Sequence, residues 1–153
     1  VGFGTNADAY DMVAPMACGT GAGKCMEISL NMAGCDPEDV GFINMHGTST
    51  PVGDIAETIA IKRVFGEHSY ELVANSTKSV MGHCIGAAGG IEAVVTIMSL
   101  INQTATPTIN LDNPDPECDL NYSPNRPTKI DTKYGMSNSF GFGGVNTTLL
   151  FKV

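Results

Sequence analysis

Residues 40–66 read VGFINMHGTSTPVGDIAETIAIKRVFG, which is a short apolar run, a turn and then a helical pattern. The run at 40–45 has the length and the apolar content of a buried strand. Thr50 suits the N-cap of a helix and Pro51 its first helical position, and apolar residues then recur at helical spacing up to Gly66. A strand that passes directly into a helix is typical of an α/β protein.

The same alternation extends outward on both sides of this stretch. The other elements are expected as strands at 1–5, 71–76, 134–142 and 145–153, and as helices at 21–34 and 86–102. The order β-α-β-α-β-α-β-β predicts a layered α/β structure with a mixed, mostly parallel sheet and an antiparallel closing pair. The Gly- and Ala-rich start of the last helix predicts close approach of another backbone. No linker or repeat divides the chain, so residues 1–153 are expected to form one domain.

Composition excludes several classes of function. The chain starts within a strand-like run and without an initiator Met, so we expect a piece of a longer polypeptide. The net charge of −8 argues against nucleic acid as a partner, and the longest apolar stretch is expected to be too short for a membrane span. Five cysteines at irregular spacings predict reduced thiols and a cytoplasmic location. A targeting segment upstream would make an organelle the alternative.

Three glycine-rich corners are candidates for a site. His46 directly follows the strand at 40–45, and STKSVMGHCIGAAGG (76–90) places Lys78 and His83 between a strand and a helix. Sites in α/β sheets form at the carboxyl ends of strands, so these three residues are expected on one rim, with the histidines facing a common cleft. The third corner, SNSFGFGGVN (137–146), predicts either a β-bulge or a mobile loop that places Phe142 over a cavity.

Other interpretations of these corners are weaker. A lone His46 is by default a structural histidine, but two histidines and a lysine together favour a site. Phosphate-binding glycine motifs are missing. A zinc site from His46, His83, Cys84 and Cys118 is disfavoured by their spacing and by the neighbouring lysine. We therefore expect no metal and no cofactor.

Four motifs occur in a fixed order, namely HGTSTPVGD (46–54), STKSVMGHCIGAAGGIEA (76–93), PTINLDNPD (107–115) and NSFGFGG (138–144). In this order they resemble the C-terminal half of β-ketoacyl-[acyl-carrier-protein] synthases, most closely the type II elongating enzyme of fatty acid synthesis. The resemblance covers essentially the whole chain. It implies a thiolase-like fold, in which two similar halves stack their sheets. It also implies three partners: an N-terminal half, acyl carrier protein, and a second copy in a homodimer.

The resemblance further implies an acyltransferase that joins an acyl thioester to malonyl-carrier protein by decarboxylative Claisen condensation. His46 and His83 match the two histidines of the family's Cys-His-His triad, where two N–H donors would stabilise charge on the thioester oxygen. The other positions implied are the nearby lysine Lys78, the supporting residues Glu92 and Phe142, and the substrate-binding residues Thr48, Thr50 and Gly143.

The nucleophilic cysteine of the family lies in the half that precedes this chain. MACGTGAG (16–23) gives Cys18 a superficially similar setting, yet we expect neither Cys18 nor Cys84 to be catalytic. The chain alone is therefore expected to be inactive. Two alternatives stay open: a ketosynthase domain of a polyketide synthase, and a non-catalytic partner subunit that lacks the cysteine.

Overall fold

A five-stranded mixed sheet forms the centre of the chain, which a computed structural model describes from residue 1 to residue 153. The sheet contains β1 (Gly2–Ala7), β2 (Val40–Asn44), β3 (Val73–Asn75), β6 (Tyr134–Gly141) and β7 (Val145–Lys152). The α-helices are α1 (Thr20–Ala33), α2 (Pro51–Phe65), α3 (Lys78–Met81) and α4 (Ala88–Asn102). Four 3-10 helices complete the helical elements: η1 (Pro37–Asp39), η2 (Gly66–Tyr70), η3 (Ile85–Ala87) and η4 (Phe142–Gly144).

The strands lie in the order β1-β7-β6-β2-β3. β2 pairs in parallel with both β6 and β3, whereas β7 pairs antiparallel with β6 and β1. Four strands therefore run in one direction and only β7 opposes them. The predicted mixed, mostly parallel sheet and its antiparallel closing pair are confirmed. The sequence pattern missed that β1 continues the sheet beyond β7.

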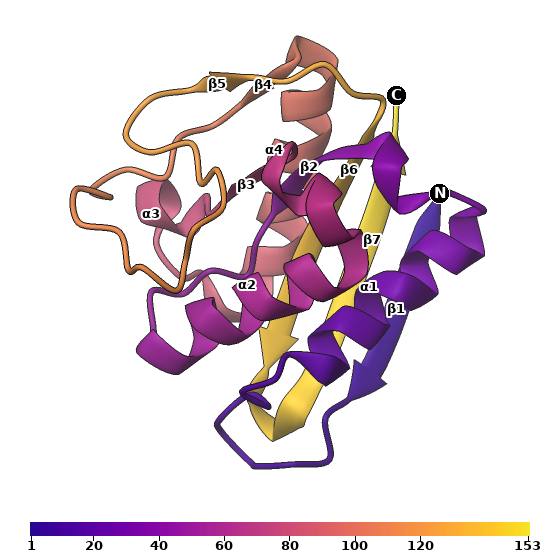
Figure 1. Ribbon diagram of the computed structural model, residues 1–153, viewed down its shortest axis with the longest axis vertical. Coiled ribbons are helices and arrows are strands. Elements are labelled where there is room, and N and C mark those ends of the chain that lie inside the picture. Colours follow the sequence, from indigo (N-terminus) through magenta and orange to yellow (C-terminus); the bar gives the residue numbers. More distant parts are fainter.

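Helices cover both faces of this sheet, with α1 and α2 on one face and α4 on the other (Figure 1). Neighbouring residues of β2 point to opposite faces, as the twofold repeat of a strand requires. Ile43 joins the larger core cluster with Met26 and Ile61, and Phe42 joins the smaller cluster with Leu100. A strand buried on both faces explains why the run at 40–45 is almost wholly apolar.

The caps of α1 and α2 show which local signals operate. Gly34 takes the left-handed conformation (φ 59°) after α1, and its N–H bonds back to carbonyls of the last turn, as expected for a helix that ends at glycine. Thr50 occupies the N-cap of α2, but its side chain makes no capping hydrogen bond. Instead Asp54, in the first turn, accepts a hydrogen bond from the N–H of Ser49 (3.1 Å). The helix start was predicted correctly, but a capping hydrogen bond from the Thr50 side chain does not form.

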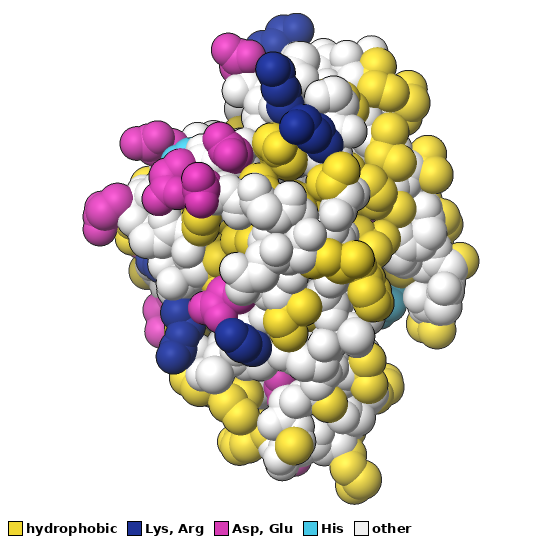
Figure 2. Space-filling view, turned by 90° about the vertical axis from the view of Figure 1, so that its right-hand side faces the viewer, with side chains coloured by type: hydrophobic (Ala, Val, Ile, Leu, Met, Phe, Trp, Pro, Cys, Tyr) yellow, Lys and Arg dark blue, Asp and Glu magenta, His cyan; other side chains and the backbone are white.

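The last predicted helix differs most from expectation. Its segment contains η3 and α4, and the short α3 precedes them. The apolar stripe is largely solvent-exposed at Ile91, Val94, Met98 and Ile101. The side of α4 that faces the sheet instead carries buried polar residues, among them Glu92, Thr96 and Ser99. Hydrophobic side chains accordingly gather along the right of Figure 2, the side on which α4 lies.

Two expectations about this segment need correction. Within this chain no backbone approaches Gly86 or Gly90, and only Gly89 lies close to another residue, the side chain of Ser139. By length and composition, Ile85–Asn102 is apolar enough to cross a membrane, contrary to the sequence-based expectation. However, the face of α4 toward the sheet is buried and polar, because Glu92 pairs there with Lys78. One face of α4 therefore packs on the sheet, and the apolar face is exposed in this chain.

The connection at 106–127 crosses the surface, as its Pro/Asn/Asp-rich sequence predicts. The two-stranded sheet of β4 (Thr104–Ala105) and β5 (Thr128–Lys129) closes it, and this small sheet was not predicted. Within the connection, the backbone carbonyl of Asn121 accepts a hydrogen bond from the N–H of Ala74 (2.9 Å). The connection thereby covers the open edge of β3, which would otherwise expose unpaired backbone groups.

Candidate active site

His46 and His83 come together at the carboxyl ends of two parallel strands. His46 lies just beyond β2, and His83 follows α3 after β3. Their ring centroids are 5.8 Å apart with the planes nearly perpendicular, and both rings line a cavity of about 770 Å³. The prediction that the two histidines share one rim and face one cleft is confirmed. Phe140 packs against the His46 ring at 5.5 Å and lines the same cavity.

A buried carboxyl group holds the turn that carries His46. Glu57 of α2 is 2% exposed, and its carboxyl oxygens accept the backbone N–H groups of His46 and Gly47, both at 3.0 Å. Asn138 of β6 donates a third hydrogen bond to the same group (3.1 Å). Burial raises the pKa of Glu57 to about 7, against the opposing effect of these donors. One side chain thus fixes the backbone of His46 to both α2 and the sheet.

The His46 ring is uncharged at neutral pH. Burial, with a smaller effect from the Lys78 charge, lowers its pKa to about 3. Its Nδ1 atom is buried and has no hydrogen-bond partner. A proton on Nδ1 would be an unpaired buried donor, which is rarer in proteins than an unpaired acceptor. The neutral ring therefore favours the tautomer with its proton on Nε2.

A residue two positions later, with a strained backbone, holds the ring of His83. The backbone N–H of Ile85 donates to Nδ1 of His83 (3.3 Å). Ile85 adopts a left-handed conformation (φ 51°), which is unusual for a β-branched residue and marks local strain. Because Nδ1 accepts this hydrogen bond, the neutral His83 ring carries its proton on Nε2. Each histidine can therefore present one N–H donor.

Lys78 lies behind the histidines rather than in the cavity. Its ammonium forms a buried ion pair with Glu92 of α4, and neither residue lines the cavity. Lys78 was predicted on the same rim as the histidines. Its ammonium is not among the groups that line the cavity, and its charge contributes to the lowered pKa of His46. A glutamate on a helix is by default a solvent-exposed charge, but Glu92 is only 1% exposed.

The cavity rim contains most of the other predicted residues. Thr48, Thr50 and Phe142 line the cavity, and Phe142 is 80% exposed in the turn η4. Gly143 does not line it, and its N–H donates to the carbonyl of Met12 (2.8 Å). The turn after β6 is thus bonded to the loop that follows β1.

The two cysteines set aside from the sequence lie outside this cavity. Cys84 is next to His83 in sequence, but it does not line the cavity, and neither does Cys18. Cys18 is exposed and shares a hydrogen bond with Thr20 (3.0 Å), which is the main cause of its lowered thiol pKa. No cysteine of this chain therefore faces the histidine pair.

Comparison with known proteins identifies the family. Residues 1–112 match the family described as beta-ketoacyl synthase, C-terminal domain. This chain belongs to that family. As a β-ketoacyl synthase C-terminal domain, it is 49% identical over 152 residues to 3-oxoacyl-[acyl-carrier-protein] synthase 2 of Synechocystis and to the protein of that name from Staphylococcus aureus. These alignments cover 99% of this chain but only 36% and 37% of the relatives. The chain therefore spans little more than a third of each relative.

Solved structures confirm the thiolase-like fold of this β-ketoacyl synthase domain. A type II polyketide ketosynthase, solved in complex with its acyl-carrier protein, superposes with a TM-score of 0.96 at 36% identity. A β-ketoacyl synthase from Burkholderia phymatum superposes with a TM-score of 0.92 at 40% identity. Each comparison covers 99% of this chain and 37% or 36% of the other. The fold is thus that of one part of a ketosynthase.

Sequence reasoning missed several residues of this β-ketoacyl synthase site. Glu57 left a readable signal, because it falls four residues before Ile61 on the buried stripe of α2, where a charged residue needs a partner. Asn138 and Phe140 were passed over in favour of Phe142, although residues two apart in a strand share one face, so the two side chains lie on the same side of β6. The strained conformation of Ile85 left no signal, because no glycine marks it.

Proposed function

We propose that this chain is the C-terminal half of a condensing enzyme of fatty acid elongation, a 3-oxoacyl-[acyl-carrier-protein] synthase. The observation that carries this proposal is the pair of imidazoles 5.8 Å apart in one cavity. The volume of about 770 Å³ is in the range of cavities that bind small-molecule groups. The 49% identity to two enzymes of that name supports the same reaction.

The histidines act in the decarboxylation of malonyl-carrier protein. The bond between the α-carbon and the carboxylate breaks, carbon dioxide leaves, and the electron pair forms an enolate with negative charge on the thioester oxygen. The Nε2–H groups of His46 and His83 donate to that oxygen as an oxyanion hole. A neutral His46 suits this role. Because its pKa is about 3, the ring is neutral at physiological pH, and a neutral imidazole still carries one N–H that can donate to the oxygen.

The enolate carbon then attacks the acyl thioester on a cysteine of the N-terminal half. A carbon–carbon bond forms, and the cysteine leaves as a thiolate that is ready for the next acyl group. Acyl carrier protein delivers both substrates, and the complete enzyme is a homodimer. The exposed apolar face of α4 and the site's lack of a nearby thiol both support a second half packed against this one.

The full-length protein tests this proposal. It is incubated with an acyl-carrier protein and malonyl-carrier protein, and the 3-oxoacyl product is measured by mass spectrometry. Product should form with the wild type and be lost in His46→Ala. His68→Gln is the matched control, because His68 bonds the carbonyl of Val40 (2.9 Å) and does not line the cavity. No product from the wild type, with decarboxylation also lacking, would contradict the proposal and favour a partner subunit.

Polyketide extension is the second candidate, because a polyketide ketosynthase has a TM-score of 0.96 with this chain. The two reactions differ in the primer, which is a reduced acyl chain in fatty acid elongation and a 3-oxo chain in polyketide extension. Presenting both primers on carrier protein distinguishes them. We expect faster condensation with the reduced chain, and the reverse preference would support the polyketide enzyme.

A further inference from the structure

A second, smaller cavity lies beside the histidine site and has no part in the reaction proposed above. It has a volume of about 280 Å³ and shares Gly47, Thr50, Pro51 and Asp54 with the larger cavity, but neither histidine lines it. Ile55 and Thr58 of α2 form one wall, and the connection at 106–127 forms the other.

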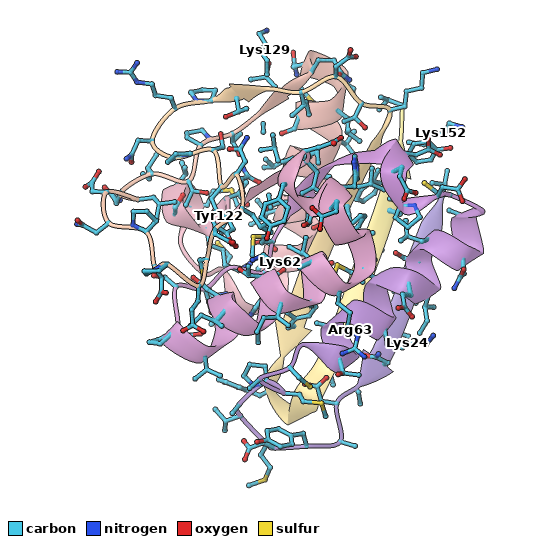
Figure 3. All side chains as sticks on the ribbon, viewed as in Figure 1. Lys24, Lys62, Arg63, Tyr122, Lys129 and Lys152 are labelled. Carbon is cyan, nitrogen blue, oxygen red and sulfur yellow. The ribbon has the colours of Figure 1, made fainter.

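The two walls of this cavity are fixed to each other. Tyr122, on the connection, shares a hydrogen bond of 2.7 Å with Thr58, on α2. Figure 3 shows Tyr122 between the connection and that helix. Because the bond joins segments far apart in the sequence, the cavity is a formed pocket and not a gap between independent loops.

The lining combines apolar side chains with two carboxyl groups. Met45, Ile55, Leu111 and Pro114 are apolar, whereas Asp54 and Asp115 are acidic and no Lys, Arg or His is among the lining residues. Asp54 accepts the N–H of Ser49 (3.1 Å), and the charge of Lys78 acts on Asp54 from outside the cavity lining. No cation forms an ion pair with either aspartate.

Charge and shape together limit the ligand. An anion would meet two carboxylates, and a purely apolar molecule would bury Asp54 further from water without giving it a partner. A cation with an apolar stem satisfies both parts of the lining, because its charged end pairs with a carboxylate while its stem contacts the apolar wall. We propose that this cavity binds a small organic cation, an alkylammonium whose nitrogen meets Asp54 and whose chain lies against Ile55 and Leu111.

The half-buried Cys118 lines this cavity and gives a direct reporter of its occupancy. In the full-length protein, the rate at which methyl methanethiosulfonate modifies Cys118 is measured by peptide mass spectrometry, with hexylammonium as the probe. Hexanol and hexanoate are matched neutral and anionic controls. Cys18 is the internal control, because it is exposed and outside the cavity.

Hexylammonium at four times its dissociation constant should slow the modification of Cys118 about fivefold, by simple occupancy, and leave Cys18 unaffected. Hexanol and hexanoate should protect far less. Asp54→Asn keeps an acceptor for the Ser49 N–H and should lose the protection, and Asp115→Asn should weaken it without loss of fold. The proposal is overturned if all three probes protect equally, if Asp54→Asn retains full protection in a folded protein, or if Cys118 does not react because another segment fills the cavity. Condensation activity does not enter this test, so its outcome is separate from the function proposed above.

Discussion

Glu57→Gln tests how the fold holds the candidate site together. A glutamine can keep one oxygen for the N–H of His46 and for Asn138, but its amide nitrogen then faces the N–H of Gly47, donor against donor. Leaving one buried donor without its acceptor costs about 1–3 kcal/mol in the free energy of unfolding. A turn displaced in this way should slow decarboxylation by about 10²-fold, as a misplaced catalytic group does.

The pH dependence of stability distinguishes this account from general damage. The folded pKa of Glu57, about 7, is raised above its ordinary value of 4.5, so the folded protein holds this proton more tightly than the unfolded chain. The contribution is fully present below pH 4.5, and about 3 kcal/mol is lost as pH rises through 7. Glutamine does not titrate, so the variant should be less stable than the wild type at pH 5, and the gap should narrow by pH 8.

Unfolding of the full-length protein is followed by fluorescence across this pH range for the wild type, Glu57→Gln and the exposed control Glu38→Gln. We expect the wild-type and Glu57→Gln curves to converge with rising pH, while Glu38→Gln follows the wild type throughout. Parallel curves for the wild type and Glu57→Gln would refute the assignment of Glu57 as a buried group that titrates near neutrality.

Three further predictions follow from the buried ion pair, the exposed loop and the incomplete core. Lys78→Met should destabilise the full-length protein by about 3–5 kcal/mol, because it leaves Glu92 charged and buried. Adding Glu92→Leu should recover much of the lost melting temperature. No recovery would mean that loss of the ion pair does not cause the destabilisation. Phe142→Ala should alter acyl loading and leave malonyl decarboxylation largely intact, since the exposed ring lies between flexible glycine positions; equal loss of both would indicate misfolding. The chain of residues 1–153 alone should associate through the exposed face of α4, and a monomer on gel filtration would contradict this. The same chain should not accept an acyl group. A stoichiometric acyl adduct on Cys18 in intact-mass spectra, absent from Cys18→Ser, would contradict that expectation.

Much of the fold was predictable because local signals agree with it. Pro51 and Gly34 mark helix ends by backbone chemistry that operates in any context, and the apolar run at 40–45 forms the central strand β2. The apolar stripe of α4 correctly predicted a helix but not its orientation. Its polar face turns toward the sheet because Glu92 pairs there with Lys78 and Thr96 accepts a hydrogen bond from Asn44 of β2 (3.2 Å). Periodicity alone carries no information about those partners.

The site was predictable to the extent that strand ends determine it. His46 and His83 each follow a strand of one parallel pair, so topology alone brings them to one edge. The residues that hold the two histidines in place were not predictable in this way. Glu57 reaches back to His46 from the middle of α2, and the N–H of Ile85 orients His83 through a strained backbone. Such contacts depend on tertiary packing and on a conformation that the sequence does not mark.

The central claim is that the paired histidines stabilise the oxyanion formed when malonyl-carrier protein loses carbon dioxide. The most direct measurement is carbon dioxide release from carboxyl-labelled malonyl-carrier protein by the full-length protein and its His83→Ala variant, with acyl loading measured in parallel. The account predicts that release falls by about 10²-fold or more, as loss of an oxyanion donor does, while acyl loading changes much less. Unchanged release in a folded His83→Ala protein would contradict the account.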